Sequence, residues 1–316
     1  MALTPKRHYH KLLAAVKDEV DYAVDSVPTG AANAIEMSNV TFTPLAGNEV
    51  ERQYIRPYFG HQGSELVGQY NRVQFTVDFA GSGTAGVAPA WGPLLRATGW
   101  AETTVEDTSV IYERASDGNG SAVMYLNLDG VNHAMLGVRG KSSAALTSLS
   151  PSTLTFEMTG LLGPITDVPL PAAVYTAWKR GLVVTKANTP LCTLFGTPLI
   201  AQSLTLDFGQ VVTTRHRIYE EGVHITDAKV TGSLQFEAKT QAAGGDWFAR
   251  ASASPKPRGA LAFQHGPTAG NIIEITAGGV EVGAPSYTNS DGMWDYTVPF
   301  VAVPTDGDDE ITITLR

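Results

Sequence analysis

The stretch Val73-Gln74-Phe75-Thr76-Val77-Asp78-Phe79 alternates apolar and polar side chains without a break. Successive side chains of a β-strand point to opposite faces of a sheet, so this period of two predicts a strand with one buried face. The same kind of apolar-polar segment recurs at 40–43, 110–115, 123–128, 154–158, 203–208, 233–237, 272–275 and 311–315. The sequence therefore predicts a mainly β fold.

Turn residues and short helical patterns separate these strands. Asp117-Gly118-Asn119-Gly120 predicts a hairpin between the strands at 110–115 and 123–128, and Asp129-Gly130 predicts a second turn. Residues 93–98 predict a helical turn among the strands, and Lys11 to Glu19 predicts a short helix. We expect these short helices to be the main exceptions to the β fold.

The charge balance argues against a protein that grips nucleic acid. Lys and Arg number 22 against 31 for Asp and Glu, which gives the 316-residue chain a formal net charge of -9. Affinity for DNA comes largely from cations that neutralise phosphates. We therefore expect no measurable binding of free subunits to duplex DNA at physiological salt.

The chain has a single cysteine and no long apolar run. Cys192 has no partner for an internal disulfide, and its apolar neighbours predict a small core residue. The apolar run Leu12 to Val16 is ended at once by Lys17, so it predicts neither a membrane span nor a signal-peptide core. We therefore expect no membrane partner, and a chain that matures in a reducing cytoplasm or leaves it without the usual secretion signal.

The second half of the chain repeats the order of elements in the first, which indicates a duplication. Ser38–Phe42, Phe75–Phe79, Leu94–Ala97, Val123–Arg139 and Ser152–Leu162 correspond to Gln202–Leu206, Leu234–Ala238, Phe248–Ala251, Leu261–Ala277 and Gly292–Val303. The first copy has insertions at 81–90 and 103–120. Between the copies, Pro164, Pro169 and Pro171 predict a joint. We expect an N-terminal arm (1–34), a first domain (35–163), a Pro-rich linker (164–181) and a second domain (182–316).

No motif predicts a catalytic, cofactor or metal site. Gly81-Ser82-Gly83-Thr84-Ala85-Gly86 matches the spacing of a dinucleotide-binding loop, but Pro89 and Pro93 follow where that loop needs a helix. We interpret it as a flexible surface loop. The histidines, including His8 and His10 in the arm, lack the spacing of zinc ligands. The basic run Arg215-His216-Arg217 predicts a polar strand edge, and the acidic segment 306–310 a solvated turn.

Three stretches resemble the major tail (tail tube) proteins of long-tailed phages. These are Val27–Ile35 leading into Ser38-Asn39-Val40, Lys186–Pro190 followed by Gln202–Gly209, and Ile225-Thr226-Asp227 with Gly232–Ala238. The resemblance implies that each domain is a β-sandwich or split barrel with a flanking helix. It also implies that six domains form a ring whose inner sheets join, and that rings stack into a tube. With two domains per chain, three chains complete a ring, a homotrimer with pseudo-sixfold symmetry.

The resemblance also implies a role and partners. The protein would be a structural component of the virion, assembled in the host cytoplasm, whose tube conducts the phage genome into the host. Its partners would be further copies of itself, the tape measure protein, the tail terminator and the distal tail protein, with DNA passing through without specific binding.

In this family the long loop after the first strand of each domain contacts the adjacent ring. Those loops correspond here to 46–68 and 209–225. The expected inter-ring residues are Gly60, His61, Gln62, Gly63, Ser64, Glu220, Glu221 and Gly222. We further expect the arm, residues 2–28, to be mobile in the free subunit and ordered by a neighbouring chain.

Two other functions stay open. One is the tube of a contractile tail or secretion-type machine, which uses similar domains. The other is a tandem pair of β-sandwich binding or adhesin modules, for which Trp91 and Trp100 are the nearest candidates for an exposed aromatic cluster. An enzyme is a third class, but no group of residues supports it.

Overall fold

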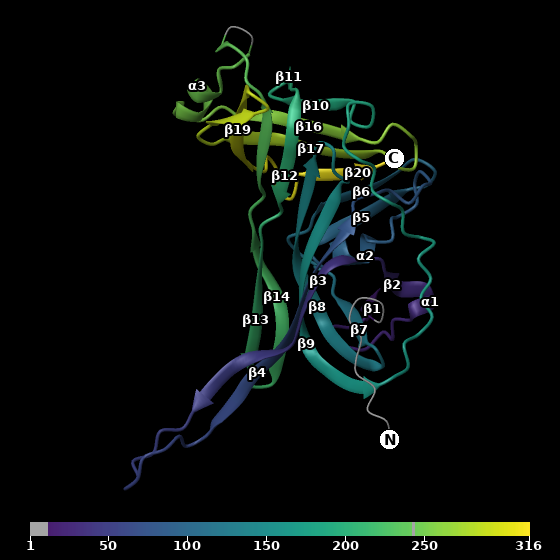
Figure 1. The fold of residues 1–316 in the computed structure, drawn as a ribbon, viewed down its shortest axis with the longest axis vertical. Coiled ribbons are helices and arrows are strands. Elements are labelled where there is room, and N and C mark those ends of the chain that lie inside the picture. Colours follow the sequence, from purple (N-terminus) through teal and green to yellow (C-terminus); the bar gives the residue numbers. More distant parts are fainter. Residues whose placement is uncertain (1–11, 242–243) are drawn as a thin grey trace.

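The computed structural model describes residues 12–241 and 244–316, and it is mainly β with three short helices in that part of the chain. The fold class expected from the alternating pattern is confirmed. We call the segment from 12 to 167 the first unit and the segment from 191 to 316 the second unit. A stretch with little regular structure, 168–190, connects them (Figure 1).

The first unit contains two short helices among its strands. Its elements are β1 (Leu12–Asp18), α1 (Gly30–Asn33), β2 (Ala34–Ile35), β3 (Ser38–Glu51), β4 (Ser64–Asp78), α2 (Gly92–Arg96), β5 (Trp100–Val105), β6 (Ser109–Arg114), β7 (Ala122–Leu128), β8 (Val131–Thr147) and β9 (Thr153–Asp167). Of these helices, α2 is the one that the sequence predicts.

The second unit has a single described helix, α3. Its elements are β10 (Leu191–Leu194), β11 (Thr197–Pro198), β12 (Ala201–Asp207), β13 (Gln210–Arg217), β14 (Glu220–Ala228), β15 (Thr231–Glu237), α3 (Trp247–Ser252), β16 (Gly259–His265), β17 (Ile273–Val282), β18 (Ser286–Ser290), β19 (Met293–Ala302) and β20 (Thr312–Leu315). The helix α3 stands where the comparison with Leu94–Ala97 predicts it.

Strands of the two units pair in the same order. In the first unit β3 pairs with β4, β4 with β9, and β9 with β8. In the second unit β12 pairs with β15, β15 with β19, and β19 with β17 and β18. The correspondence extends to an outer layer, where β2, β1 and β7 match β11, β10 and β16.

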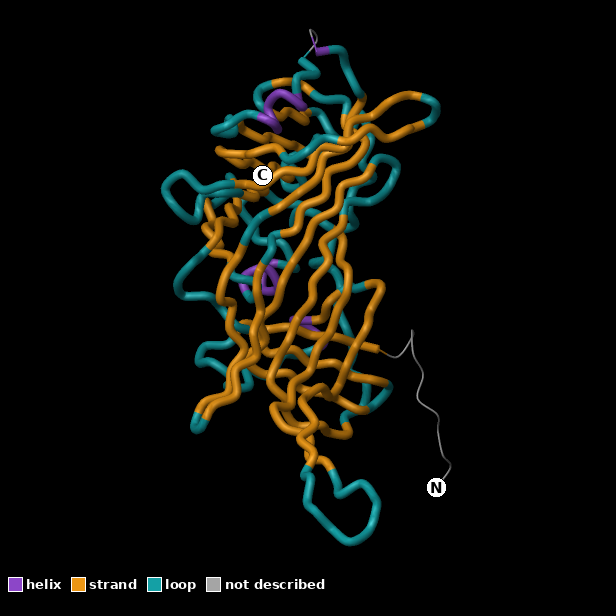
Figure 2. The backbone as a smooth tube through the Cα atoms, turned by 90° about the vertical axis from the view of Figure 1, so that its left-hand side faces the viewer, coloured by secondary structure: helices purple, strands orange, loops and turns teal. Residues whose placement is uncertain are grey.

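One strand pair joins the two inner sheets into a single sheet. Ser203 to Asp207 of β12 pair antiparallel with Ser143 to Thr147 of β8. The long strands consequently run side by side across both units (Figure 2). Because β12 occupies one side of β8 and β9 the other, the sheet continues without an exposed edge at the boundary between the units.

Alternation puts one face of this sheet into a common hydrophobic core. Phe75, Phe156, Leu204 and Phe236 contribute to it from different strands, and each is at most 2% exposed. Both helices have a tryptophan at their start: Trp91 precedes α2 and Trp247 opens α3, and both are buried in this core. The opposite face of the sheet is polar.

The helix expected over 11–19 is wrong. Residues 12–18 form β1, which pairs with β7 and β2, while Lys11 lies outside the described residues. Leu13, Ala14, Ala15 and Val16 are all buried, so both faces of the segment are covered. A run of apolar residues buried on both faces lacks the alternation of a half-exposed strand, and short apolar runs cannot be assigned from periodicity alone.

The hairpin expected across Asp117–Gly120 is also wrong. The residues do turn the chain, but β6 pairs with β5 and β20, whereas β7 pairs with β1 and β8. Both edges of β7 are therefore occupied by strands other than β6. The second expected turn, at Asp129-Gly130, does connect a hairpin, β7 to β8.

Two further segments differ from the sequence expectation. The strand β9 continues through Pro164 to Asp167, and its pairing with β8 shifts register beside this proline, where no backbone N–H is needed. The segment 209–225, expected as a loop, is mostly strand and forms most of the β13/β14 hairpin. In the other expected loop, 46–68, residues 46–51 and 64–68 are the outer ends of β3 and β4, and 52–63 is a loop.

Candidate assembly surfaces

The contact between β8 and β12, which we call the internal seam, is closely packed. Leu204 and Leu206 of β12 lie on the core face opposite Leu146 and Ala144 of β8. All four side chains are at most 2% exposed. Beside them Phe208 packs edge-to-face on Trp100, with 4.9 Å between ring centroids. The internal seam thus buries the apolar residues of both strands.

The strand β3 corresponds to β12 but leaves its outer edge open. Among the described residues β3 pairs with β4 alone. Val40 and Phe42 occupy the core-facing positions, and both are only partly buried against the core. Leu204 and Leu206, at the corresponding positions of β12, are fully buried. Apolar side chains left half-exposed beside unpaired backbone groups are typical of an edge that another strand covers.

At the other end of the sheet, β18 also has an open edge. In the part of the chain that the structure describes, it pairs only with β19. Tyr287 of β18 is 55% exposed and lies 5.6 Å from Phe248 of α3, 5.9 Å from Trp294 and 5.0 Å from Tyr296 between ring centroids. Trp294 is 62% exposed. We call Phe248, Tyr287, Trp294 and Tyr296 the aromatic cluster.

The β3/β4 hairpin projects away from the rest of the molecule (Figure 1). The expected inter-ring residues Gly60, His61, Gln62 and Gly63 lie in the loop at its tip, and Ser64 is the first residue of β4. Gln62 closes the loop by accepting a hydrogen bond from the backbone N–H of Tyr54 and donating one to its carbonyl oxygen. The same loop exposes four large apolar side chains, which sequence reasoning missed: Tyr54, Ile55, Tyr58 and Phe59.

The β13/β14 hairpin, in contrast, lies against the first unit. Tyr22 accepts a hydrogen bond from the backbone N–H of Val223 at 2.6 Å. Arg139 donates to the carbonyl oxygen of Val223 at 2.9 Å, and its guanidinium lies 4.9 Å from the Tyr22 ring centre. The expected inter-ring residues Glu220, Glu221 and Gly222 begin β14 just after the exposed tip residues Ile218 and Tyr219.

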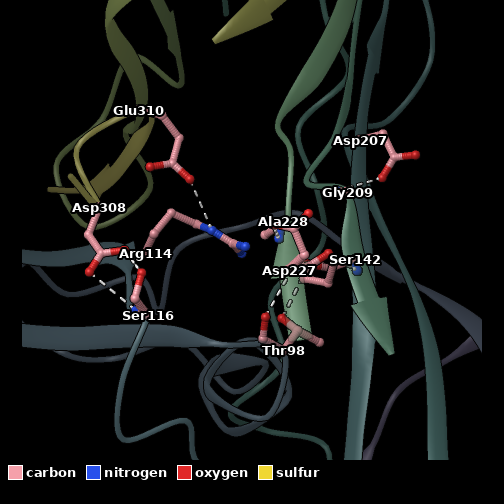
Figure 3. Close-up of polar contacts among 11 residues, drawn as sticks. Thr98, Arg114, Ser116, Ser142, Asp207, Gly209, Asp227, Ala228, Asp308 and Glu310 are labelled. Atoms are coloured by element: carbon pink, nitrogen blue, oxygen red, sulfur yellow. Dashed lines mark hydrogen bonds and ion pairs between the residues drawn. The ribbon is translucent and has the colours of Figure 1, made fainter. Parts of the chain in front are cut away.

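A buried glutamine fixes the base of this hairpin. Gln210, 4% exposed, accepts a hydrogen bond from the backbone N–H of Ser142 and donates to the carbonyl oxygen of Thr98 and to the Ser142 hydroxyl. Thr98 and Ser142 also bond to each other at 3.2 Å (Figure 3). The buried polar groups of this network thus have hydrogen-bond partners, as buried polar groups in proteins generally do. These partners lie in the other unit or in a neighbouring residue.

Beside this network a pocket of about 430 Å³ lies between the units. Arg114, 6% exposed, pairs through Nε with Glu310 at 3.4 Å, and Asp308 accepts hydrogen bonds from Ser116 (Figure 3). Burial lowers the pKa of the Arg114 guanidinium, and the Glu310 carboxylate opposes that shift. The acidic segment 306–310 is therefore more than a solvated turn, because two of its carboxylates contact the first unit.

The glycine-rich loop is a contact between the units as well. The backbone N–H of Gly81 donates to the Asn271 side chain at 2.7 Å, and that of Gly83 donates to the carbonyl oxygen of Gly270 at 2.9 Å. Gly81 and Gly86 are buried, so the expectation of a flexible surface loop is wrong for these residues. The third glycine, Gly86, does not begin a helix: α2 begins at Gly92.

Other residues that the sequence marks have structural surroundings. Trp91 and Trp100, considered for an exposed aromatic cluster, are 2% and 3% exposed, so that assignment is wrong. Cys192 is partly buried against the core, and burial raises the pKa of its thiol to about 12. His8 and His10 lie outside the described residues. Within residues 12–241 and 244–316, no three His, Cys, Asp or Glu side chains are grouped as metal ligands would be.

Comparison with known proteins identifies no relative. No protein family model matches the chain, and no curated protein sequence is similar to it. Over the described residues, no helix is both long enough and apolar enough to cross a bilayer.

Proposed function

We propose that this chain is a major tail tube subunit of a long-tailed phage, and that its copies polymerise as stacked rings into the conduit through which the genome leaves the virion. Three copies make one ring, because each supplies two of the six units that the family resemblance implies. The protein acts as a structural component and catalyses no reaction.

One observation supports this proposal above the others. Two units with the same strand order continue one sheet through the internal seam, and within residues 12–241 and 244–316 the sheet ends at both sides in open strands, β3 and β18. A third unit, from another copy, that is added in the same way would pair with one of these two open edges. A sheet extended repeatedly by the same rotation closes into a ring when the rotations add up to a full turn, and closure removes the exposed edges.

The polar face of the sheet has a composition that suits a conduit. Its strands present hydroxyl and amide side chains, and neighbouring hydroxyls bond to each other: Thr76 to Thr155 at 3.2 Å and Thr288 to Thr297 at 3.0 Å. The cations Arg72 and Lys141 on this face both pair with Glu157. A wall with its cations neutralised offers DNA few phosphate contacts, so the duplex would slide.

The proposed partners follow from the position of such a subunit in a tail. They are further copies of the chain, the tape measure protein inside the tube, the tail terminator and the distal tail protein. The tube is assembled in the host cytoplasm and becomes part of the virion. A contractile tail or secretion-type tube would use the same edges. Binding of a sheath protein to the assembled tube would distinguish that function from the one proposed.

The aromatic cluster favours one alternative from another class. Exposed Tyr287 and Trp294 beside Phe248 could stack on sugar rings, as in a tandem β-sandwich binding module. In that case the protein would stay monomeric and bind glycans.

Negative-stain electron microscopy with light scattering on the purified protein distinguishes these functions. We expect hollow tubes, or rings with the mass of three chains. A monomer at high protein concentration, with no tubes on the grid, contradicts the proposal, and retention on a glycan array would then favour the binding module.

A further inference from the structure

The two units can be superposed strand by strand through their pairing registers. Phe42 pairs with Val73 on β4, and Leu206 pairs with Gly232 on β15. The next strand of the sheet is β9 in the first unit and β19 in the second. There Phe75 of β4 lies opposite Phe156, and Leu234 of β15 lies opposite Val298. The correspondence of Phe75–Phe79 with Leu234–Ala238 makes Phe75 equivalent to Leu234. Two residues earlier on each strand Val73 corresponds to Gly232, so Phe42 is equivalent to Leu206.

The same procedure aligns β18 with the last part of β8. Leu154 of β9 pairs with Ala144, and its equivalent Tyr296 of β19 pairs with Tyr287. Tyr287 is thereby equivalent to Ala144. The equivalence continues along both strands in step, so Thr288 corresponds to Ala145 and Ser286 to Ser143.

The internal seam then supplies a register for the open edges. Within the chain Leu206 lies opposite Ala144, and Thr205 lies opposite Ala145. Replacing each residue by its equivalent puts Phe42 opposite Tyr287 and Thr41 opposite Thr288. Because Phe42 and Tyr287 both lie on the core side of their strands, the transferred register joins apolar face to apolar face and polar face to polar face, as a sheet with one buried side requires.

The side chains at the two edges are complementary in kind. Tyr287 is an exposed ring of β18 in contact with Phe248 of α3. Phe42 is a half-buried ring in edge contact with His133, with 5.4 Å between ring centroids. On the polar side, threonine would face threonine. Aromatic pairs and Thr–Thr pairs directly opposite each other are among the favourable cross-strand neighbours of antiparallel sheets.

We infer that β3 of one copy pairs antiparallel with β18 of the next, with Phe42 opposite Tyr287 and Thr41 opposite Thr288, and that Phe42 covers the aromatic cluster. This inference rests on the proposed function for the number of copies, but not for the register, which comes from the internal seam. The partner for these edges is a second copy of the same chain, and the contact joins two different surfaces.

Disulfide cross-linking tests the register. In a Cys192→Ala background, the double variant Thr41→Cys/Thr288→Cys puts two thiols opposite each other between copies. Mild oxidation of assembled protein should give covalently linked chains on a non-reducing gel, with a three-chain product as the largest band. The double variant Thr41→Cys/Ser290→Cys is displaced by two residues on the same face, and it should cross-link at least tenfold less, because a disulfide requires Cβ atoms within about 4.5 Å.

Two controls make the result interpretable. The equivalent pair in the internal seam, Ala145→Cys/Thr205→Cys, should close a disulfide within one chain and shows that this geometry permits the bond. A mixture of single variants, Thr41→Cys with Thr288→Cys, should give two-chain products and nothing larger, because each chain then carries only one half of the contact.

The possible outcomes separate the register from the function. Tubes on the grid without a 41–288 cross-link, or with a stronger 41–290 cross-link, overturn the inferred register and leave the proposed function standing. Cross-linked chains without tubes support the register and contradict the tube. A folded monomer that neither cross-links nor polymerises overturns both.

A second variant tests the contact without cysteines. Phe42→Asp inserts a carboxylate that would be buried against the aromatic cluster in the assembled protein but stays at an edge in the monomer. We expect the concentration needed for assembly to rise at least tenfold, while circular dichroism and the melting temperature of the monomer show that it is folded. A folded variant that assembles normally contradicts the inference.

Discussion

The β3/β4 and β13/β14 hairpins are equivalent in the two units, but one projects into solvent and the other lies on protein. The second hairpin is held at its base by Gln210 and near its tip by Tyr22 and Arg139. Counting on from the equivalent residues Thr43 and Asp207, β3 has Ala46 where the second hairpin has Gln210. The first hairpin thus lacks the anchor, and its tip exposes aromatic side chains.

This difference indicates which hairpin needs another chain. Four large apolar side chains in one exposed loop form a patch that isolated soluble proteins rarely maintain, and such patches mark interaction surfaces. The seated hairpin already has its contacts within the chain, and it exposes only Ile218 and Tyr219 as large apolar residues at the tip. In the proposed tube, we therefore expect the projecting hairpin to make the main stacking contact between rings.

The largest effect is expected from shortening the projecting hairpin. Replacing residues 54–62 by an Asn-Gly turn removes Tyr54, Ile55, Tyr58 and Phe59 and keeps a turn compatible with the flanking strands. We expect polymerisation into tubes to be lost while single rings and the monomer's melting temperature are retained. Electron microscopy and calorimetry measure the two quantities.

The matched control is a double substitution that keeps the length of the chain. Ile218→Asn/Tyr219→Gly changes the tip of the seated hairpin, and tubes should still form, with a smaller decrease in their length or number. Tubes of normal length from the 54–62 replacement would show that stacking relies on another surface.

An intermediate effect is expected at the anchor of the seated hairpin. Gln210→Leu leaves the Ser142 N–H and the Thr98 carbonyl without their buried partner, which costs about 1–3 kcal/mol of the free energy of unfolding. Solvent-facing Gln74→Leu on β4 should change that free energy by at most about 0.5 kcal/mol. Urea denaturation of the monomer compares them, and equal stabilities would mean that the hairpin is seated by packing alone.

The smallest effect is expected near the tip of the same hairpin. Tyr22→Phe removes the hydroxyl that accepts from the Val223 N–H but keeps the ring under Arg139. A single hydrogen bond contributes about 1 kcal/mol, so unfolding should become easier by roughly that amount. Hydrogen exchange at Val223 should also accelerate. Unchanged exchange there argues that the contact does not hold the hairpin.

A local helical pattern predicted the helix near 93–98, and the repeat of the two halves predicted its counterpart at 248–251. Alternation along the sequence predicted the strands, because a sheet with one buried face imposes its period on the residues. It failed at Leu13–Val16, where burial on both faces removes the period. It also failed at Asp117–Gly120, where a local turn carries no information on which distant strand occupies the neighbouring position in the sheet.

The assembly surfaces were predicted only in outline. The hairpin tips at 60–64 and 220–222 came from the family resemblance, whose role for them stays a prediction. No local pattern distinguishes Gln210 or Tyr22 from other polar residues, because their partners are far away in the chain. The open edges could not be predicted from the sequence either. Val40 and Leu204 occupy the same kind of alternating segment, and only the structure shows that Leu204 is covered and Val40 is not.

The internal seam has a mechanical consequence for the proposed ring. It is reinforced by β20 pairing with β6 and by the Gly81 loop on Gly270 and Asn271, and the polypeptide itself bridges it. The corresponding insertions are missing from the second unit, so a contact between copies lacks these reinforcements. Under internal pressure a ring of three chains would open at three of its six joints, and the tube's bursting strength would be set by the pairing of β3 with β18.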